Sequence, residues 1–332
     1  MRPIAMQIQQ IVLASHPQGM PTLTDFQLAD STLPAVSPGQ VLVRATHVSV
    51  DPYLRSLMKE GAVFRPHQPL VGALVGVVAE SQAEGFAVGD TVVGNLPWAT
   101  HALATPGQLQ KADTSELPAS AYLGLLGMPG LTAYFGLELA QLQAGETLVV
   151  SGAAGAIGTI IGQVGKLKGC RVIGIAGSDE KARQLKATGG YSEVINYKTQ
   201  DVAQELAAHC PDGIAVYFDN VGGAVSAAVL PLIQLHARVV VCGQIATYNE
   251  AGSPQAGFDL LPLILNKAAW VQGYHVSDYP DRFPEAVQQL TAWYRQGQVT
   301  IAETVLDGFD KLPEAFVGLF TGQNTGKMLV KV

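Results

Sequence analysis

Residues 147–168 read TLVVSGAAGAIGTIIGQVGKLK, and this stretch decides the fold. Residues 147–151 are apolar or small and end at a glycine-rich turn, which predicts a buried strand. The turn at residues 152–158 opens a helix that we predict over residues 157–168. A strand, a glycine-rich turn and a helix in this order are typical of the first unit of a nucleotide-binding sheet.

The glycines of the turn have the spacing that a dinucleotide needs. Gly155 and Gly158 occupy the second and third glycine positions of the dinucleotide-binding fingerprint, and Ala153 occupies the first. The second glycine lets the backbone approach a pyrophosphate, and the third permits close helix–strand packing. Ala156 and Ile157 add backbone amides at the positive end of the helix. We therefore predict dinucleotide binding here, with a purely structural turn as the alternative.

Strands and helices alternate from this stretch toward the C-terminus. Strands are predicted at residues 147–151, 171–176, 193–196, 214–219, 239–242 and 269–274. Helices are predicted at residues 157–168, 179–188, 202–209, 225–234, 258–267 and 282–296. Apolar strands separated by helices indicate a parallel sheet covered on both faces. The predicted fold class is therefore α/β, with a doubly wound, six-stranded Rossmann domain.

The two ends of the chain have a different pattern. Before residue 120, short strands are predicted at residues 40–45, 72–80 and 91–94, without a helical repeat of any length. The tail has strand character at 304–306 and 327–331 around a short helix at 312–320. A mostly β tail after an α/β domain suggests that the chain returns to its first domain. We place one domain at residues 1–122 and 298–332, and the other at residues 123–297.

The composition excludes several classes of protein. The chain has 332 residues, of which 48% are hydrophobic and 14% charged, so it can bury a large core. Its net charge is −7 and it has no lysine- or arginine-rich run, which argues against nucleic acid or an anionic membrane as partners. Residues 1–10 contain three glutamines where a signal peptide needs an unbroken apolar stretch, so we expect none. The most apolar long window, residues 121–137, is interrupted by four glycines and Pro129, and the three cysteines form no short-spaced pair. We expect a cytoplasmic protein that binds neither nucleic acid nor membranes.

The strand after the glycine turn favours NADPH over NADH. An NAD enzyme usually carries Asp or Glu at the end of this strand, where the carboxylate accepts hydrogen bonds from the ribose 2′-hydroxyl. Here the strand ends at Ser178, and Lys181 follows one helical turn later. Lys181 can pair with a 2′-phosphate and Ser178 can donate to it. The alternative for Lys181 is a solvated helix lysine, and Asp179 and Glu180 can be ordinary helix-dipole partners.

Several motifs in order resemble the medium-chain dehydrogenase/reductase superfamily. They are residues 48–55 (VSVDPYLR), 127–137 (GMPGLTAYFGL), 178–181 (SDEK), 196–198 (NYK), 218–223 (FDNVGG), 242–243 with 247–249 (CG and TYN) and 324–327 (NTGK). More narrowly, the chain resembles the zinc-free branch of leukotriene 12-hydroxydehydrogenases, prostaglandin reductases and alkenal double-bond reductases. The match covers most of the chain.

This resemblance implies a GroES-like β domain built from both chain ends, a Rossmann domain in the middle, and a homodimer joined through the Rossmann sheets. It implies that Lys181 binds the 2′-phosphate of NADPH and Tyr197 the adenosine. The rest of the cofactor would be lined by Thr132, Asn220, Cys242, Gly243, Tyr248 and Asn324. Asn220 and Asn324 can instead cap loops, and Cys242 is expected to be a small buried residue without thiol chemistry.

The residues themselves argue against zinc. Structural zinc sites need clustered thiolates, and no cysteine precedes Cys170. The superfamily's Gly-His-Glu ligand motif is replaced by residues 71–76, VGALVG. We predict no metal site.

Without a metal, hydride must reach a carbon that is already electrophilic, such as the β-carbon of an enone or enal. The site must then supply a hydrogen-bond donor for the enolate oxygen. Tyr53 and Tyr248 are the candidates, because a phenol stays protonated at neutral pH; each could instead be a packing residue. The resemblance implies that the nicotinamide ribose 2′-hydroxyl shares this role. The alternatives are a zinc-free NADPH quinone reductase and an inactive NADPH-binding structural or sensor protein.

Overall fold

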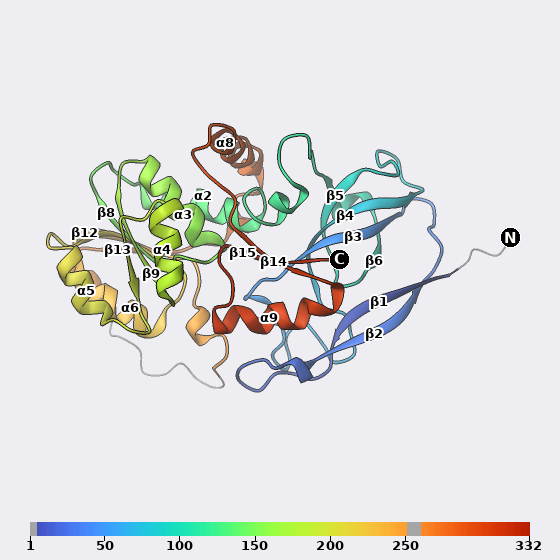
Figure 1. The fold of residues 1–332 in the computed structure, drawn as a ribbon, viewed down its shortest axis with the longest axis horizontal. Coiled ribbons are helices and arrows are strands. Elements are labelled where there is room, and N and C mark those ends of the chain that lie inside the picture. Colours follow the sequence, from blue (N-terminus) through green and yellow to red (C-terminus); the bar gives the residue numbers. More distant parts are fainter. Residues whose placement is uncertain (1–4, 251–259) are drawn as a thin grey trace.

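A computed structural model describes residues 5–250 and 260–332 of the chain. Figure 1 shows two bodies side by side, with the parallel sheet and its helices in one and antiparallel strands in the other. The last part of the chain, including α9 (Leu312–Thr321), returns to the antiparallel body. This confirms the predicted fold class.

The parallel sheet has six strands in the order β10-β9-β8-β11-β12-β13. Their bounds are Thr147–Ser151 (β8), Arg171–Ala176 (β9), Glu193–Asn196 (β10), Ile214–Asp219 (β11), Ile233–Val241 (β12) and Trp270–Gly273 (β13). The strand order reverses between β8 and β11, so the carboxyl ends of these two strands form the switch point of the sheet. Ligands of open α/β sheets bind at this kind of switch point.

Helices cover both faces of this sheet. They are Met128–Ala140 (α2), Ala156–Leu167 (α3), Asp179–Thr188 (α4), Val202–His209 (α5), Gly223–Val229 (α6), Leu260–Lys267 (α7) and Phe283–Arg295 (α8). Separate clusters of buried apolar side chains fill the two faces, one around Val150 and Phe218 and the other around Val149 and Tyr217. Alternate residues of β8 and β11 therefore point to opposite faces.

The second sheet combines strands from both ends of the chain. Its order is β14-β15-β3-β4-β5-β7, with β6 paired to β3. The bounds are Val41–Ser49 (β3), Val71–Ser81 (β4), Thr91–Pro97 (β5), His101–Ala104 (β6), Leu109–Lys111 (β7), Glu303–Asp307 (β14) and Lys327–Lys331 (β15). A two-stranded antiparallel ribbon, Met6–Leu13 (β1) and Phe26–Leu33 (β2), lies beside this sheet, and α1 is a single turn at Leu54–Leu57.

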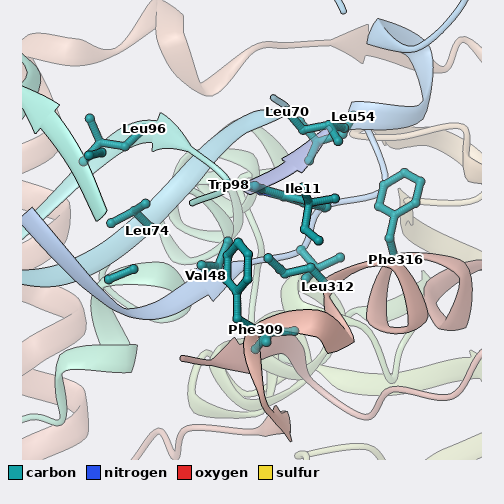
Figure 2. Close-up of a cluster of buried hydrophobic side chains, with 14 of the residues drawn as sticks. Ile11, Val48, Leu54, Leu70, Leu74, Leu96, Trp98, Phe309, Leu312 and Phe316 are labelled. Carbon is teal, nitrogen blue, oxygen red and sulfur yellow. The ribbon is translucent and has the colours of Figure 1, made fainter. Parts of the chain in front are cut away.

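The core of this body joins the two chain ends physically. Figure 2 shows Trp98 and Val48 from the first third of the chain packed with Phe309, Leu312 and Phe316 from the last. The rings of Trp98 and Phe316 meet edge to face, with centroids 6.3 Å apart. Trp98 is fully buried, and the burial of its large apolar surface stabilises the packing of the C-terminal residues against the N-terminal strands.

One predicted helix was wrong in its bounds, and one helix was missed. The helix predicted over residues 225–234 ends at Val229, and after a short 3-10 turn β12 begins at Ile233. The helix α2 was not predicted, although nine of its residues are buried. The strands predicted at residues 40–45, 72–80 and 91–94 correspond to β3, β4 and β5, three of the seven strands that the described residues before 120 form. Residues 258–259 of the predicted helix 258–267 lie outside the described residues.

None of the helices in the described parts of the chain combines the length and apolar character that crossing a bilayer would require.

Candidate cofactor-binding and active site

The predicted cofactor residues lie in a row at one edge of the parallel sheet. In the strand order of the sheet, Tyr197 follows β10, Ser178 follows β9, the glycine turn follows β8, Asn220 follows β11 and Cys242 follows β12. Because parallel strands end at the same edge, these residues form a line across the switch point. Lys181 and Tyr197 lie at one end of this line, and Cys242 and Gly243 lie at the other. A dinucleotide is an extended molecule, so a line of this kind suits it.

The glycine turn is packed as a phosphate-binding loop requires. A Cβ atom at Gly158 would lie 2.5 Å from the carbonyl oxygen of Gly152, so only glycine fits there. The Tyr191 hydroxyl donates to the carbonyl oxygen of Gly158 at 2.6 Å and fixes this first turn of α3. Gly155 is the N-cap of α3, so the amides of Ala156 and Ile157 begin the helix and have no helical acceptor. These amides and the helix dipole suit a pyrophosphate.

Lys181 lies in the first turn of α4, just beyond the carboxyl end of β9. Ser178 is the N-cap of α4, and its side chain accepts from the backbone amide of Lys181 at 3.3 Å. The Lys181 ammonium donates to the carbonyl oxygen of Gly322 at 2.7 Å. Burial, and then the neighbouring charge of Lys198, lower the pKa of Lys181. An incoming phosphate would reverse both penalties, because it brings negative charge to a partly desolvated cation.

The neighbours of Lys181 clarify which other groups can read the phosphate. Asp179 accepts from the Asn196 side chain at 2.7 Å, so its carboxylate is engaged inside the protein. Lys198 is close enough to affect the pKa of Lys181, whereas Arg171 begins β9 at the strand's opposite end and donates to His209. Arg171 is therefore not placed to bind the same phosphate as Lys181. The Tyr197 ring lies against Gly177 and is half exposed, as an adenosine platform would be.

Asn220 has an unpaired acceptor at the centre of the row. Its backbone amide donates to the Ser151 hydroxyl at 2.9 Å, and its Nδ2 donates to the Ser151 carbonyl oxygen at 2.8 Å. Its Oδ1 is buried and accepts no hydrogen bond from the described protein atoms. A buried acceptor without a donor is costly. A ribose hydroxyl or amide of a dinucleotide would satisfy it, so these residues fit the cofactor.

Asp219 organises this part of the site, a role that the sequence did not reveal. Its side chain is 4% exposed. It accepts hydrogen bonds from the side chains of Ser151, Tyr217, Ser226 and Gln244 and from the amides of Val221 and Gly222. The carboxylate thus holds the turns after β8, β11 and β12 together. The sequence signals were a polar residue at the end of an otherwise apolar strand and its place in the motif 218–223.

The turn after β12 brings Cys242, Gly243 and Tyr248 together. The amides of Cys242 and Gly243 both donate to the Asp219 carbonyl oxygen, at 2.8 and 3.1 Å. Burial raises the pKa of the Cys242 thiol to about 12, so it is no nucleophile at neutral pH. The Tyr274 hydroxyl lies 3.8 Å from this sulfur and donates to the Thr132 carbonyl oxygen at 2.6 Å. Thr132, on α2, is therefore anchored beside Cys242.

The two candidate catalytic tyrosines come from different sheets. The Tyr248 hydroxyl lies 3.5 Å from the Gln244 amide and close to Gly243, at the β12 end of the row. Tyr53 precedes α1 in the antiparallel body and is 36% exposed. Burial, and then the Asp51 carboxylate, raise the pKa of Tyr53 to about 12. Burial also raises the pKa of Tyr248. Both phenols are therefore protonated hydrogen-bond donors at neutral pH.

One segment connects the surroundings of the two tyrosines. The Arg55 side chain, which is 2% exposed, donates to the carbonyl oxygens of Pro17 and Gly19. The next residue, Met20, accepts a hydrogen bond from the Asn249 side chain through its sulfur at 3.3 Å. The turn that carries Tyr53 and the turn that carries Tyr248 thus both contact the same segment of chain, across the boundary between the two sheets.

The segment 322–326 reaches from the antiparallel body to the phosphate loop. The Gly326 amide donates to the Ala154 carbonyl oxygen at 2.8 Å, and Gly326 forms a parallel bridge with Gly155. Asn324 closes this turn through a 2.8 Å hydrogen bond from its Nδ2 to the Gly326 carbonyl oxygen. Asn324 therefore lies beside the loop and has the capping role that was the alternative, while its contact with the cofactor stays a prediction.

A zinc site does not fit the side chains present. Within residues 5–250 and 260–332, no three His, Cys, Asp or Glu side chains gather as metal ligands.

Known proteins match this chain along almost its whole length. Two family models match, "N-terminal domain of oxidoreductase" over residues 9–112 and "Zinc-binding dehydrogenase" over residues 156–292. The NADPH-dependent curcumin reductase of Escherichia coli is 38% identical over 97% of this chain and 96% of its own length. The NADP(+)-dependent 2-alkenal reductase of Nicotiana tabacum is 38% identical over 98% of this chain and 97% of its own length.

A solved structure of similar sequence has the same fold. The crystal structure of CurA from Vibrio vulnificus in complex with NADPH is 40% identical, with a TM-score of 0.92, and the match covers 98% of this chain and 99% of that one. A parallel sheet with a phosphate loop at its switch point, joined to an antiparallel body, defines a two-domain dinucleotide-dependent oxidoreductase. The chain belongs to the medium-chain dehydrogenase/reductase superfamily, in the branch of the prostaglandin, 2-alkenal and curcumin reductases.

Proposed function

We propose that this protein uses NADPH to reduce the carbon–carbon double bond of α,β-unsaturated aldehydes and ketones. The observation that carries the proposal is the pair of protonated phenols, Tyr53 and Tyr248, in turns that both contact the chain segment 17–20. The relatives' names support it, because they include an NADPH-dependent curcumin reductase and an NADP(+)-dependent 2-alkenal reductase.

The cofactor would be held along the carboxyl edge of the parallel sheet. Lys181 and Ser178 would bind the 2′-phosphate, and Tyr197 would pack on the adenosine. The amides of Ala156 and Ile157 would bind the pyrophosphate. Asn220 Oδ1, Thr132, Cys242, Gly243 and Asn324 would line the nicotinamide half. When bound, NADPH supplies the hydride.

The tyrosines would act on the charge that the reaction creates. As hydride adds to the β-carbon, the π electrons of the double bond move onto the carbonyl oxygen and form an enolate. A phenol that donates a hydrogen bond to this oxygen stabilises the transition state more than the ground state. The raised pKa of Tyr53 keeps its proton in place throughout. Protonation of the α-carbon then completes the reduction.

Single-turnover kinetics on Tyr→Phe variants test the assignment. Removal of one hydrogen bond aimed at developing charge costs about 10²–10³ in turnover. We expect Tyr53→Phe or Tyr248→Phe to slow NADPH oxidation by an enal to that extent, with the Kd of NADPH almost unchanged. Tyr122→Phe is a matched control, because the hydroxyl of Tyr122 bonds to the backbone of Asp113 and belongs to neither turn that carries a candidate tyrosine. Wild-type rates in both single variants and the double variant would refute the assignment.

The substrate panel also separates the two alternatives. A zinc-free quinone reductase would turn over benzoquinones faster than 2-alkenals or long-chain enones. An inactive sensor would bind NADPH tightly and oxidise it with none of them. NADPH consumption followed at 340 nm against all three substrate classes distinguishes these outcomes.

We also propose that the protein is cytoplasmic and has two domains, one formed by residues 1–122 and 298–332 and the other by residues 123–297. We further propose that two copies form a homodimer through their Rossmann sheets. Strand β13 lies at the end of the described sheet order, and a free strand edge can pair with another chain. Trp270 on β13 is 37% exposed, and Leu261 and Leu265 on α7 are 76% and 80% exposed. Sedimentation of wild type and of Leu265→Lys tests this assembly, since a dimer would dissociate on that charge.

A further inference from the structure

Lys327 is a buried cation that has no part in the proposed reaction. Its side chain is 3% exposed, and its ammonium donates to the carbonyl oxygen of Val50 at 2.7 Å and to that of Met328 at 3.1 Å. Its third partner is the Asp51 carboxylate at 3.0 Å, whose side chain is 7% exposed. The Ser49 hydroxyl donates to the other oxygen of this carboxylate.

The ion pair lies between two parts of the site. Asp51 is two residues before Tyr53, in the turn from β3 to α1. Lys327 directly follows Gly326, whose amide donates to Ala154 in the phosphate loop. Two contacts therefore link the phosphate loop to the turn of Tyr53: the backbone hydrogen bond from Gly326 to Ala154 and the buried ion pair of Lys327 with Asp51. Neither contact involves an exposed side chain.

Stability alone does not explain such a pair. Burying two charges costs desolvation that their attraction only partly offsets, and apolar residues of similar volume often give an equally stable protein. A buried, fully hydrogen-bonded pair does fix geometry, because its three acceptors surround the ammonium in one arrangement. A catalytic hydrogen bond needs this kind of support, since a displacement of about 1 Å can cost about 10²-fold in rate.

We propose that Lys327 and Asp51 are positioning residues that hold the Tyr53 hydroxyl at a fixed place relative to the phosphate loop. The proposal rests on the proposed function, in which Tyr53 donates to the enolate. The pair touches neither substrate nor cofactor and acts only through Tyr53 and the segment 322–326.

A double-mutant cycle tests this role. Asp51→Asn keeps the size of the side chain and one acceptor for Lys327 but removes the charge. We expect it to lower the rate of hydride transfer to a 2-alkenal about 10- to 100-fold and to leave the Kd of NADPH within about threefold. In a Tyr53→Phe background the same substitution should change the rate less than about twofold, because the hydroxyl that it positions is already absent.

The controls separate a positioning role from a structural one. Lys331→Met breaks the exposed Lys331–Asp307 pair on the same strand, so it should leave the rate unchanged in either background. If Asp51→Asn does not fold, Asp51→Asn/Lys327→Met removes both charges and should show the same dependence on Tyr53. An equal loss in the Tyr53→Phe background, or wild-type rates in both pair variants, would overturn the positioning role alone. Wild-type turnover in Tyr53→Phe would overturn the proposed role of Tyr53 and the pair's role with it.

Discussion

The ammonium of Lys181 and the carbonyl oxygen of Gly322 lie 2.7 Å apart, although 141 residues separate them in the chain. Lys181 belongs to α4 beside the parallel sheet, and Gly322 is the left-handed cap that ends α9. The antiparallel body thus orients the ammonium that we propose binds the 2′-phosphate. An ammonium has three donors, so Lys181 can keep this bond and still pair with a phosphate.

Lys181→Ala should weaken NADPH binding and leave NADH binding almost unchanged. A hydrogen bond to a charged group contributes about 1.5–3 kcal/mol, which corresponds to roughly ten- to a hundredfold in affinity. Fluorescence titration with both cofactors measures the effect, and it should shrink at high salt where the pair is partly solvated. Arg183→Ala, an exposed cation on the same helix, is the control. Equal losses for NADPH and NADH would show that Lys181 supports the fold instead.

Turnover should not fall on the alkaline side because of Tyr53. The reaction needs the protonated phenol, which is present below its pKa and lost as the pH rises through it. Since burial and Asp51 raise this pKa to about 12, the rate of hydride transfer should stay level from pH 7 to about 10. A pH–rate profile of the wild type checks this. A fall centred below pH 10 that disappears in Tyr53→Phe would contradict it.

Activity should survive removal of metal ions. No group of three His, Cys, Asp or Glu side chains in the described chain is arranged to hold one, and the donors of the proposed mechanism are phenols. Turnover of a 2-alkenal after extensive treatment with a strong chelator should match that of untreated protein. Loss of activity that added zinc restores would show that the reaction depends on metal.

Asp219→Asn should reduce both stability and affinity for NADPH. The amide nitrogen cannot accept the hydrogen bonds that the buried carboxylate now accepts, and each bond to a charged group contributes about 1.5–3 kcal/mol. We expect a loss of roughly 2–4 kcal/mol in the free energy of unfolding, measured in urea. Asp212→Asn, in an exposed turn of the same sheet, should change neither quantity. Unchanged NADPH affinity in a destabilised Asp219→Asn would limit Asp219 to a folding role.

Glu303→Gln should stabilise the protein above neutral pH. Burial raises the pKa of Glu303, and its Oε1 has no hydrogen-bond partner among the described atoms. The folded protein therefore holds this proton to higher pH than the unfolded chain, so stability falls as the pH rises through the folded pKa. The Tm of Glu303→Gln should exceed the wild-type value by roughly 1–3 °C at pH 8 and match it at pH 4. An equal increase at both values would assign the effect to packing, and exposed Glu84→Gln should show none.

Local pattern determined much of the Rossmann sheet. Strands β8 to β11 and helices α4 and α5 have the bounds that the sequence predicted, because alternation and N-cap residues act within a few positions. The helix α2 was missed because it is buried on nearly all sides and lacks an amphipathic repeat. The helix predicted over residues 225–234 joined α6 to the start of β12, because the short apolar run between them gives no periodicity that separates a helix from a strand.

By itself the sequence determined the class of fold, the phosphate loop and the place of Lys181 one turn after β9, since all three depend on spacing within one strand–turn–helix unit. Only the tertiary structure decided what surrounds them. Three sets of contacts join residues up to 276 positions apart. They are the hydrogen bond from Lys181 to Gly322, the hydrogen bonds that the Asp219 carboxylate accepts, and the Lys327–Asp51 ion pair. A buried charge is tolerated only where distant chain segments supply its partners, and those partners exist only once the two ends of the chain have packed together.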